Sequence, residues 1–118
     1  MTAEQIELEA SLRAVETAIN QSQAYVHLGN KDRGFWNNRE HVYAFTITRL
    51  GVPYAQYTLG ADCCALIHTE ISEAVEALRK PKHTIDSTAK DSFGGELADA
   101  VIRIMDLCAF FNIPLGTA

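Results

Sequence analysis

The chain has 118 residues and a formal net charge of −5, and 47% of its residues are hydrophobic. This length suits one domain with one core, so we expect a single domain over residues 1–118. The acidic balance disfavours a general nucleic-acid binder, which ordinarily carries a basic surface, but a bound cation can still bring phosphates to an acidic site.

Three features predict a cytoplasmic protein without a membrane partner. The acidic N-terminal segment lacks the apolar core of a signal peptide. No apolar run approaches the roughly 20 residues that span a bilayer. The cysteines are Cys63, Cys64 and Cys108, and they form no CxxC pair. We therefore expect neither disulfides nor a zinc site, but small core residues in a reducing compartment.

The first half of the chain predicts one long helix and one short one. Thr2, with a glutamine three residues later, has capping-box spacing and begins a predicted helix over residues 2–28. Gly29 predicts its end. Residues 30–40 are polar and predict a loop. Residues 41–50 are β-branched and aromatic, but a lone strand would have no pairing partner, so we favour a short helix.

The second half predicts two strong helices, over residues 61–79 and 94–111. Residues 51–60 contain two glycines and a proline and predict a connector. Residues 81–93 predict a polar loop after a cationic, proline-containing helix end. These elements together predict an all-α fold, a bundle of four or five helices.

Each strong helix carries two carboxylates three residues apart, Glu70 with Glu73 and Glu96 with Asp99. Residues at this spacing share a helix face, so four carboxylates converge if the two helices face each other. Crowded like charges oppose ionisation, and a divalent cation relieves the conflict. Oxygen-only ligands suit magnesium, manganese or calcium, and magnesium often shares substrate phosphates. The pattern therefore indicates metal-dependent phosphate-ester chemistry.

Other interpretations of these carboxylates stay open. Glutamates three residues apart usually form a solvated helix face. An ion pair of Arg103 with Glu70 or Glu73 would give these carboxylates a purely structural role. A ferritin-like di-iron site is disfavoured, because it needs Glu-x-x-His repeats that the chain lacks.

Residues 65–80, ALIHTEISEAVEALRK, and 94–107, GGELADAVIRIMDL, resemble the MazG-like all-α NTP pyrophosphohydrolases of the phage and integron-cassette type. The ExxE and ExxD motifs of that family fall on the two carboxylate pairs. The resemblance implies cleavage of a (d)NTP to (d)NMP and pyrophosphate, in the house-cleaning of nucleotides. It implies Mg²⁺, with Mn²⁺ as a substitute, held by Glu70, Glu73, Glu96 and Asp99. It also implies a homodimer or a dimer of dimers (homotetramer).

Several residues are candidates for catalysis or for contact with the substrate. Glu70 or Glu73 is a candidate general base. Trp36 could stack on a base, or anchor its loop in the core. Lys80 could meet the β and γ phosphates, or act as a helix C-terminal cation. Arg103 could contact a phosphate group or form an internal ion pair. Two other functions remain: a nucleotide-binding module without turnover, and a structural dimerisation protein.

Overall fold

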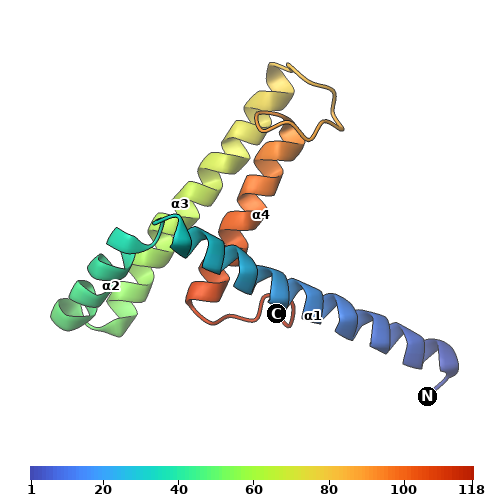
Figure 1. Cartoon of the computed structure of the whole chain (residues 1–118), viewed down its shortest axis with the longest axis horizontal. Helices are drawn as coiled ribbons and strands as arrows, with labels where there is room; N and C mark the ends of the chain where they lie inside the picture. The colour runs from blue at the N-terminus through green and yellow to red at the C-terminus, as the bar shows by residue number, and fades with distance from the viewer.

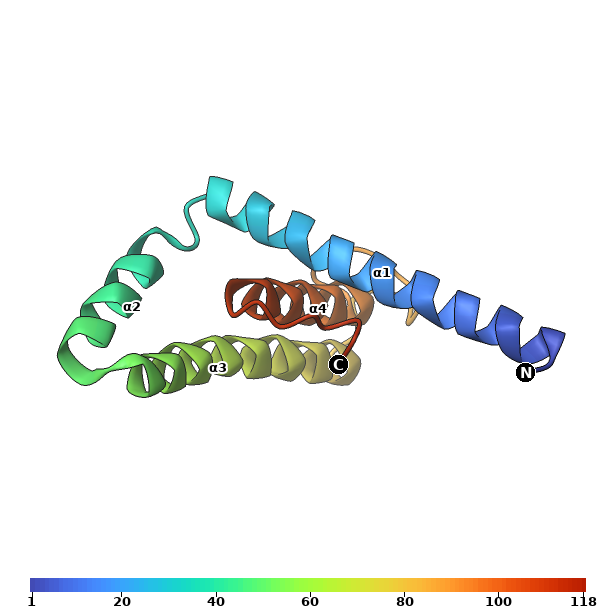
Figure 2. The same ribbon diagram turned by 90° about the horizontal axis from the view of Figure 1, so that it is seen from below.

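The computed structural model describes all 118 residues as four α-helices without a strand, which confirms the all-α prediction. The helices are α1 (Ala3–Asp32), α2 (Asn37–Leu50), α3 (Val52–Arg79) and α4 (Phe93–Phe110). Helices α3 and α4 run antiparallel side by side, and α2 folds back along the first half of α3 (Figure 1). Helix α1 crosses α4 and projects beyond it (Figure 2). None of the four helices combines the length and apolarity that crossing a membrane requires.

Helix α1 begins as predicted but ends later. The Thr2 hydroxyl accepts a hydrogen bond from the Gln5 N–H, and the Gln5 side chain accepts one from the Thr2 N–H. The predicted end at Gly29 is wrong, because the helix continues to Asp32. A glycine inside a helix costs only about 1 kcal/mol. The side chain of Asn30, which donates to a carboxylate on α4, offsets that cost.

The short helix predicted over 41–50 is confirmed, and it begins four residues earlier than predicted, at Asn37. The loop predicted over residues 30–40 is therefore mostly helical, and only residues 33–36 connect α1 to α2. Gly34 makes that tight connection possible, because its φ of 83° lies in the left-handed region that glycine adopts without strain.

The connector predicted over residues 51–60 is wrong, because α3 starts at Val52 and runs through this segment. Pro53 sits in the first helical turn, where its missing N–H costs no hydrogen bond. Gly51 turns the chain between α2 and α3 with a φ of 91°. Gly60 lies within the helix and faces the Phe111 ring. Pro53 therefore marks the start of α3, and Gly60 marks a packing contact within it. Neither residue interrupts the helix.

The second predicted loop and the last helix agree with the structure to within a residue. Helix α3 ends at Arg79, and α4 begins at Phe93 and ends at Phe110. The Ser92 hydroxyl caps α4 by accepting a hydrogen bond from the Gly95 N–H. This cap fixes the first turn of α4, which carries part of the candidate site.

The core of the single chain is small. The Trp36 ring stacks on Phe110 with centroids 4.4 Å apart, and Leu59 and Cys63 pack beside it. Only 10 of the 118 residues are buried, and Cys64, which we expected in the core, is exposed. The radius of gyration is 17.7 Å, whereas a compact domain of this length has about 13.5 Å. One chain alone is thus an open arrangement of helices.

Candidate metal centre

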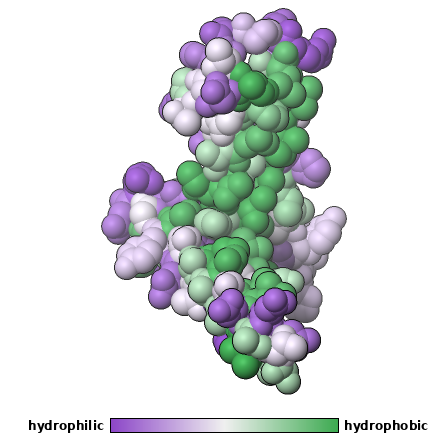
Figure 3. Space-filling view, turned by 90° about the vertical axis from the view of Figure 1, so that its right-hand side faces the viewer, coloured by the Kyte–Doolittle hydropathy of each residue, from purple (hydrophilic) through white to green (hydrophobic).

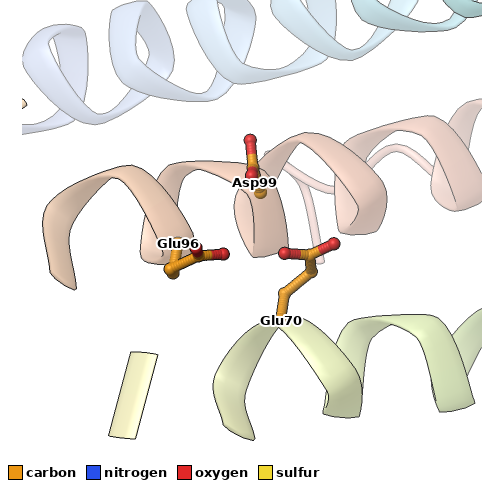
Figure 4. Close-up of side chains that lie close together, drawn as sticks. All are labelled: Glu70, Glu96 and Asp99. Atoms are coloured by element: carbon orange, nitrogen blue, oxygen red, sulfur yellow. The ribbon is translucent and has the colours of Figure 1, made fainter. Parts of the chain in front are cut away.

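Three of the four predicted carboxylates come together between α3 and α4. Glu70 extends from α3 toward Glu96 and Asp99, which lie one turn apart near the start of α4 (Figure 4). One oxygen from each of the three carboxylates lies within 4.8 Å of the other two. Glu70 is buried, and the other two residues are half-buried. The antiparallel pairing of the helices produces this convergence, as the i, i+3 spacing predicted.

Glu73 lies beside this group without joining it. It is exposed, one turn beyond Glu70, and its carboxylate is close enough to Glu96 to affect the pKa of that group. Desolvation, followed by the neighbouring carboxylates of Glu73 and Glu70, raises the pKa of Glu96 from 4.5 to about 7. A proton on Glu96 therefore relieves the charge conflict at neutral pH. A divalent cation would relieve the same conflict by displacing that proton.

Arg103 supplies the one cation paired with the group. Its Nε lies 2.9 Å from Oε1 of Glu70, and the Glu70 side chain is only 10% exposed. The structure thus contains the internal ion pair that we weighed against a phosphate contact. One guanidinium cannot neutralise Glu70, Glu96 and Asp99 together, so the group keeps an excess of negative charge when it is ionised.

A depression of about 300 Å³ adjoins the carboxylates. Its charged lining residues are Glu73, Glu76, Lys80, Lys82, Asp91 and Glu96. Lys80 also pairs with Glu76 at 3.1 Å, one turn back on α3, and both side chains are exposed. The predicted phosphate-binding residue Lys80 therefore lies at the depression that Glu73 and Glu96 border, and its side chain is exposed.

Trp36 lies away from this depression, in the core. Its side chain is 1% exposed, one ring face is stacked on Phe110, and its Nε1 donates to both oxygens of Asp106 at 3.0 and 3.1 Å. No face of the ring is free for a nucleobase, so the predicted base-stacking role does not fit this placement. Trp36 instead anchors its connection in the core, which was the alternative interpretation.

Asp106 is the centre of a buried polar network that we did not predict. Besides Trp36, it accepts a hydrogen bond from Asn30 at 2.8 Å and contacts Nδ1 of His27 at 2.7 Å. Three side chains from two distant segments thus satisfy one buried carboxylate. The i, i+3 spacing of His27 and Asn30 on α1 was visible in the sequence, but nothing there identified their partner on α4.

The chain matches no protein-family model, and no curated protein or solved structure resembles it at a significant level. The resemblance to MazG-like pyrophosphohydrolases therefore stays a prediction.

Proposed function

We propose that this protein is a magnesium-dependent nucleoside triphosphate pyrophosphohydrolase, which converts a (d)NTP to (d)NMP and pyrophosphate. The observation that carries the proposal is the group formed by Glu70, Glu96 and Asp99, whose oxygens lie within 4.8 Å of one another on two facing helices. The resemblance of the two acidic segments to MazG-like enzymes supports the same reaction.

The donor set fits a magnesium ion. All three groups are carboxylates, which suit Mg²⁺ or Mn²⁺ better than zinc. Desolvation and the carboxylates of Glu73 and Glu70 raise the pKa of Glu96, so a bound cation would be favoured over its proton as the pH rises. Glu70, Glu96 and Asp99 would hold the ion, with Glu73 at the edge. When bound, the ion would offset phosphate charge and polarise the phosphorus–oxygen bonds.

Glu73 is the better candidate for the general base. Glu70 is buried and paired with Arg103, whereas Glu73 is exposed at the depression. In the proposed reaction, water attacks the α phosphorus and gives a proton to Glu73. The bond to the bridging oxygen breaks, and pyrophosphate leaves with its electron pair. Lys80 and Lys82 offset the negative charge on the leaving group.

The proposed setting is the cytoplasm, and the proposed role is the removal of surplus or non-standard nucleotides. We also propose that the chain works as a homodimer or homotetramer. The small core of the single chain supports self-association, because only 10 residues are buried and many large apolar side chains are exposed.

The first test is a product assay with each common NTP and dNTP, in magnesium and in EDTA. We expect monophosphate and pyrophosphate in magnesium only, and their loss in Glu73→Gln. Glu7→Gln, an exposed glutamate on α1, is the matched control and should retain activity. Diphosphate with orthophosphate would show that a different bond is cut, and no product from any nucleotide would refute the hydrolase.

One observation favours a second candidate. The Arg103–Glu70 ion pair gives the acidic residues between α3 and α4 a structural role, as expected for a dimerisation protein. Such a protein should melt at the same temperature with and without magnesium. A nucleotide-binding module without turnover would instead be stabilised by magnesium and NTP together, and would release no pyrophosphate.

A further inference from the structure

The single chain exposes more surface than a folded monomer of its mass. Its accessible surface is 8254 Å² for 13.0 kDa, whereas monomers of that mass expose about 6,300 Å². The excess, about 1,900 Å² per chain, gives about 3,800 Å² when two chains share an interface, within the roughly 2,000–5,000 Å² range of obligate dimers. A partner as large as a second copy of this chain would remove the excess.

The first half of α1 contributes an apolar stripe with no neighbour in its own chain. Residues 3–15, here called the arm, project away from the other helices (Figures 1 and 2). Leu8, Leu12 and Val15 are 60%, 59% and 55% exposed. Their i, i+4, i+7 spacing places them on one face. Farther along α1 the same face contacts the C-terminal segment through Gln23, so the stripe extends an existing contact surface outward.

A groove of matching character lies between α2 and the first half of α3. Its cavity is about 460 Å³. Ala55 and Leu59 are buried in it, and Val42 is 62% exposed at its edge. Its charged lining residues are Arg39 and Asp62, which lie 3.9 Å apart. An amphipathic helix typically binds such a groove through apolar anchors at i, i+4 and i+7.

Charge distinguishes this groove from the other exposed apolar surface. Apolar side chains also gather along α3 and α4 (Figure 3). The exposed apolar residues of these two helices include Ile71, Val75, Val101 and Ile102. Acidic residues outnumber basic ones in α1, α3 and α4, whereas α2 has two arginines and one glutamate. The arm has three glutamates and one arginine. Like-charge repulsion therefore disfavours the α3–α4 surface and a second arm. It does not disfavour the groove, whose charged lining residues Arg39 and Asp62 balance each other.

We propose that the arm of one copy lies in the α2–α3 groove of a second copy, with Leu8, Leu12 and Val15 directed into the groove. Reciprocal placement of two arms gives a closed two-fold dimer. This inference rests on the proposed self-association and specifies its surfaces. It is independent of the hydrolase reaction, whose test measures product and not assembly.

Cross-linking between differently tagged copies tests the contact. One copy carries Leu12→Cys and the other Val42→Cys, both with Cys64→Ser to remove the exposed native thiol. After mixing and subunit exchange, a short bis-maleimide should link the two tags. Ala10→Cys, on the opposite side of the arm, is the matched control and should link at least tenfold less. Stronger linkage between two Leu12→Cys copies would indicate paired arms and overturn the proposal.

Sedimentation of Leu12→Asp gives the second readout. We expect a dimeric wild type, a monomeric Leu12→Asp variant and a dimeric Ala10→Asp control. A wild type that stays monomeric at high concentration would overturn both the self-association and the contact. A Leu12→Asp variant that stays dimeric would overturn the arm contact alone. Neither result depends on whether the protein hydrolyses nucleotides.

Discussion

Helix α4 carries carboxylates in two surroundings, and the contrast between them separates structure from function. Asp106, near its C-terminal end, is buried and receives hydrogen bonds from Trp36 and Asn30, with His27 2.7 Å away. Near its N-terminal end, Glu96 and Asp99 face Glu70. That second group has one paired cation, Arg103.

The two surroundings differ in how fully the negative charge of the carboxylates is balanced. Asp106 has donors for both of its oxygens, so an added cation would gain little there. In the other group, desolvation and then the nearby carboxylates of Glu73 and Glu70 raise the pKa of Glu96. One guanidinium is not enough to balance these carboxylates. We therefore propose that the electrostatic conflict identifies a ligand site, and we interpret the satisfied network around Asp106 as structural.

Asp106→Ala should produce the largest loss of stability. The change removes a buried carboxylate and leaves the donors of Trp36 and Asn30 without a partner. Breaking a buried, charged network from one side costs about 3–5 kcal/mol. Urea unfolding measures the free energy, and Asp86→Asn in the exposed loop is the control. A loss below about 1 kcal/mol would mean that the network does not hold α1 to α4.

Magnesium should stabilise the folded protein through the group on α3 and α4. At a hundredfold excess over its dissociation constant, a ligand that binds only the folded state adds about 2.7 kcal/mol. Thermal melts with magnesium and with EDTA measure the shift, and Asp99→Asn should remove most of it. An equal shift in Asp99→Asn and the parent protein would place the ion elsewhere.

Local sequence patterns predicted the features that depend on near neighbours. The capping box at Thr2, the helix end at Arg79 and the i, i+3 carboxylate pairs all depend on residues within one or two turns. Gly29 and Gly60 misled the prediction, because tertiary contacts decided their conformation. A glycine against the Phe111 ring cannot be distinguished by sequence from a glycine in a loop.

The same local patterns could not predict contacts between distant segments. His27 and Asp106 are 79 residues apart, and only the crossing of α1 over α4 brings them together. The same crossing makes Trp36 a core residue, although most of its neighbours in the sequence, apart from Phe35, are polar. The convergence of the carboxylates was predictable because two strong adjacent helices with a loop between them are expected to pack antiparallel.

Arg103→Gln should have a smaller effect, and one that magnesium reverses. Without the guanidinium, Glu70 keeps a largely buried charge next to two other carboxylates. Because Arg103 is itself 32% exposed, we expect a loss of about 1–2 kcal/mol in EDTA. A bound cation should recover most of this loss, so the magnesium-induced shift in melting temperature should exceed that of the parent protein.

The matched control is Arg79→Gln, whose partner Glu76 lies on the surface of α3. An exposed pair of this kind contributes at most about 0.5 kcal/mol. Similar losses in the two variants, or an unchanged magnesium response in Arg103→Gln, would contradict the view that Arg103 offsets the carboxylates of the site.

The smallest predicted effect is a pH dependence of the metal-free protein, because Glu96 is only half-buried and solvent screens its interactions. The pKa of Glu96 is raised from 4.5 to about 7, so the folded state binds its proton more tightly than the unfolded state does. The contribution of Glu96 to stability is therefore complete below pH 4.5 and declines as the pH rises toward 7. Glu96→Gln cannot lose a proton, so the difference in unfolding free energy between Glu96→Gln and the parent should grow over that range and level off above it. Urea unfolding in EDTA at several pH values measures this difference. A constant difference from pH 4.5 to 8 would show that neither desolvation nor the neighbouring carboxylates raise the pKa of Glu96, which would remove the electrostatic contrast between the two ends of α4.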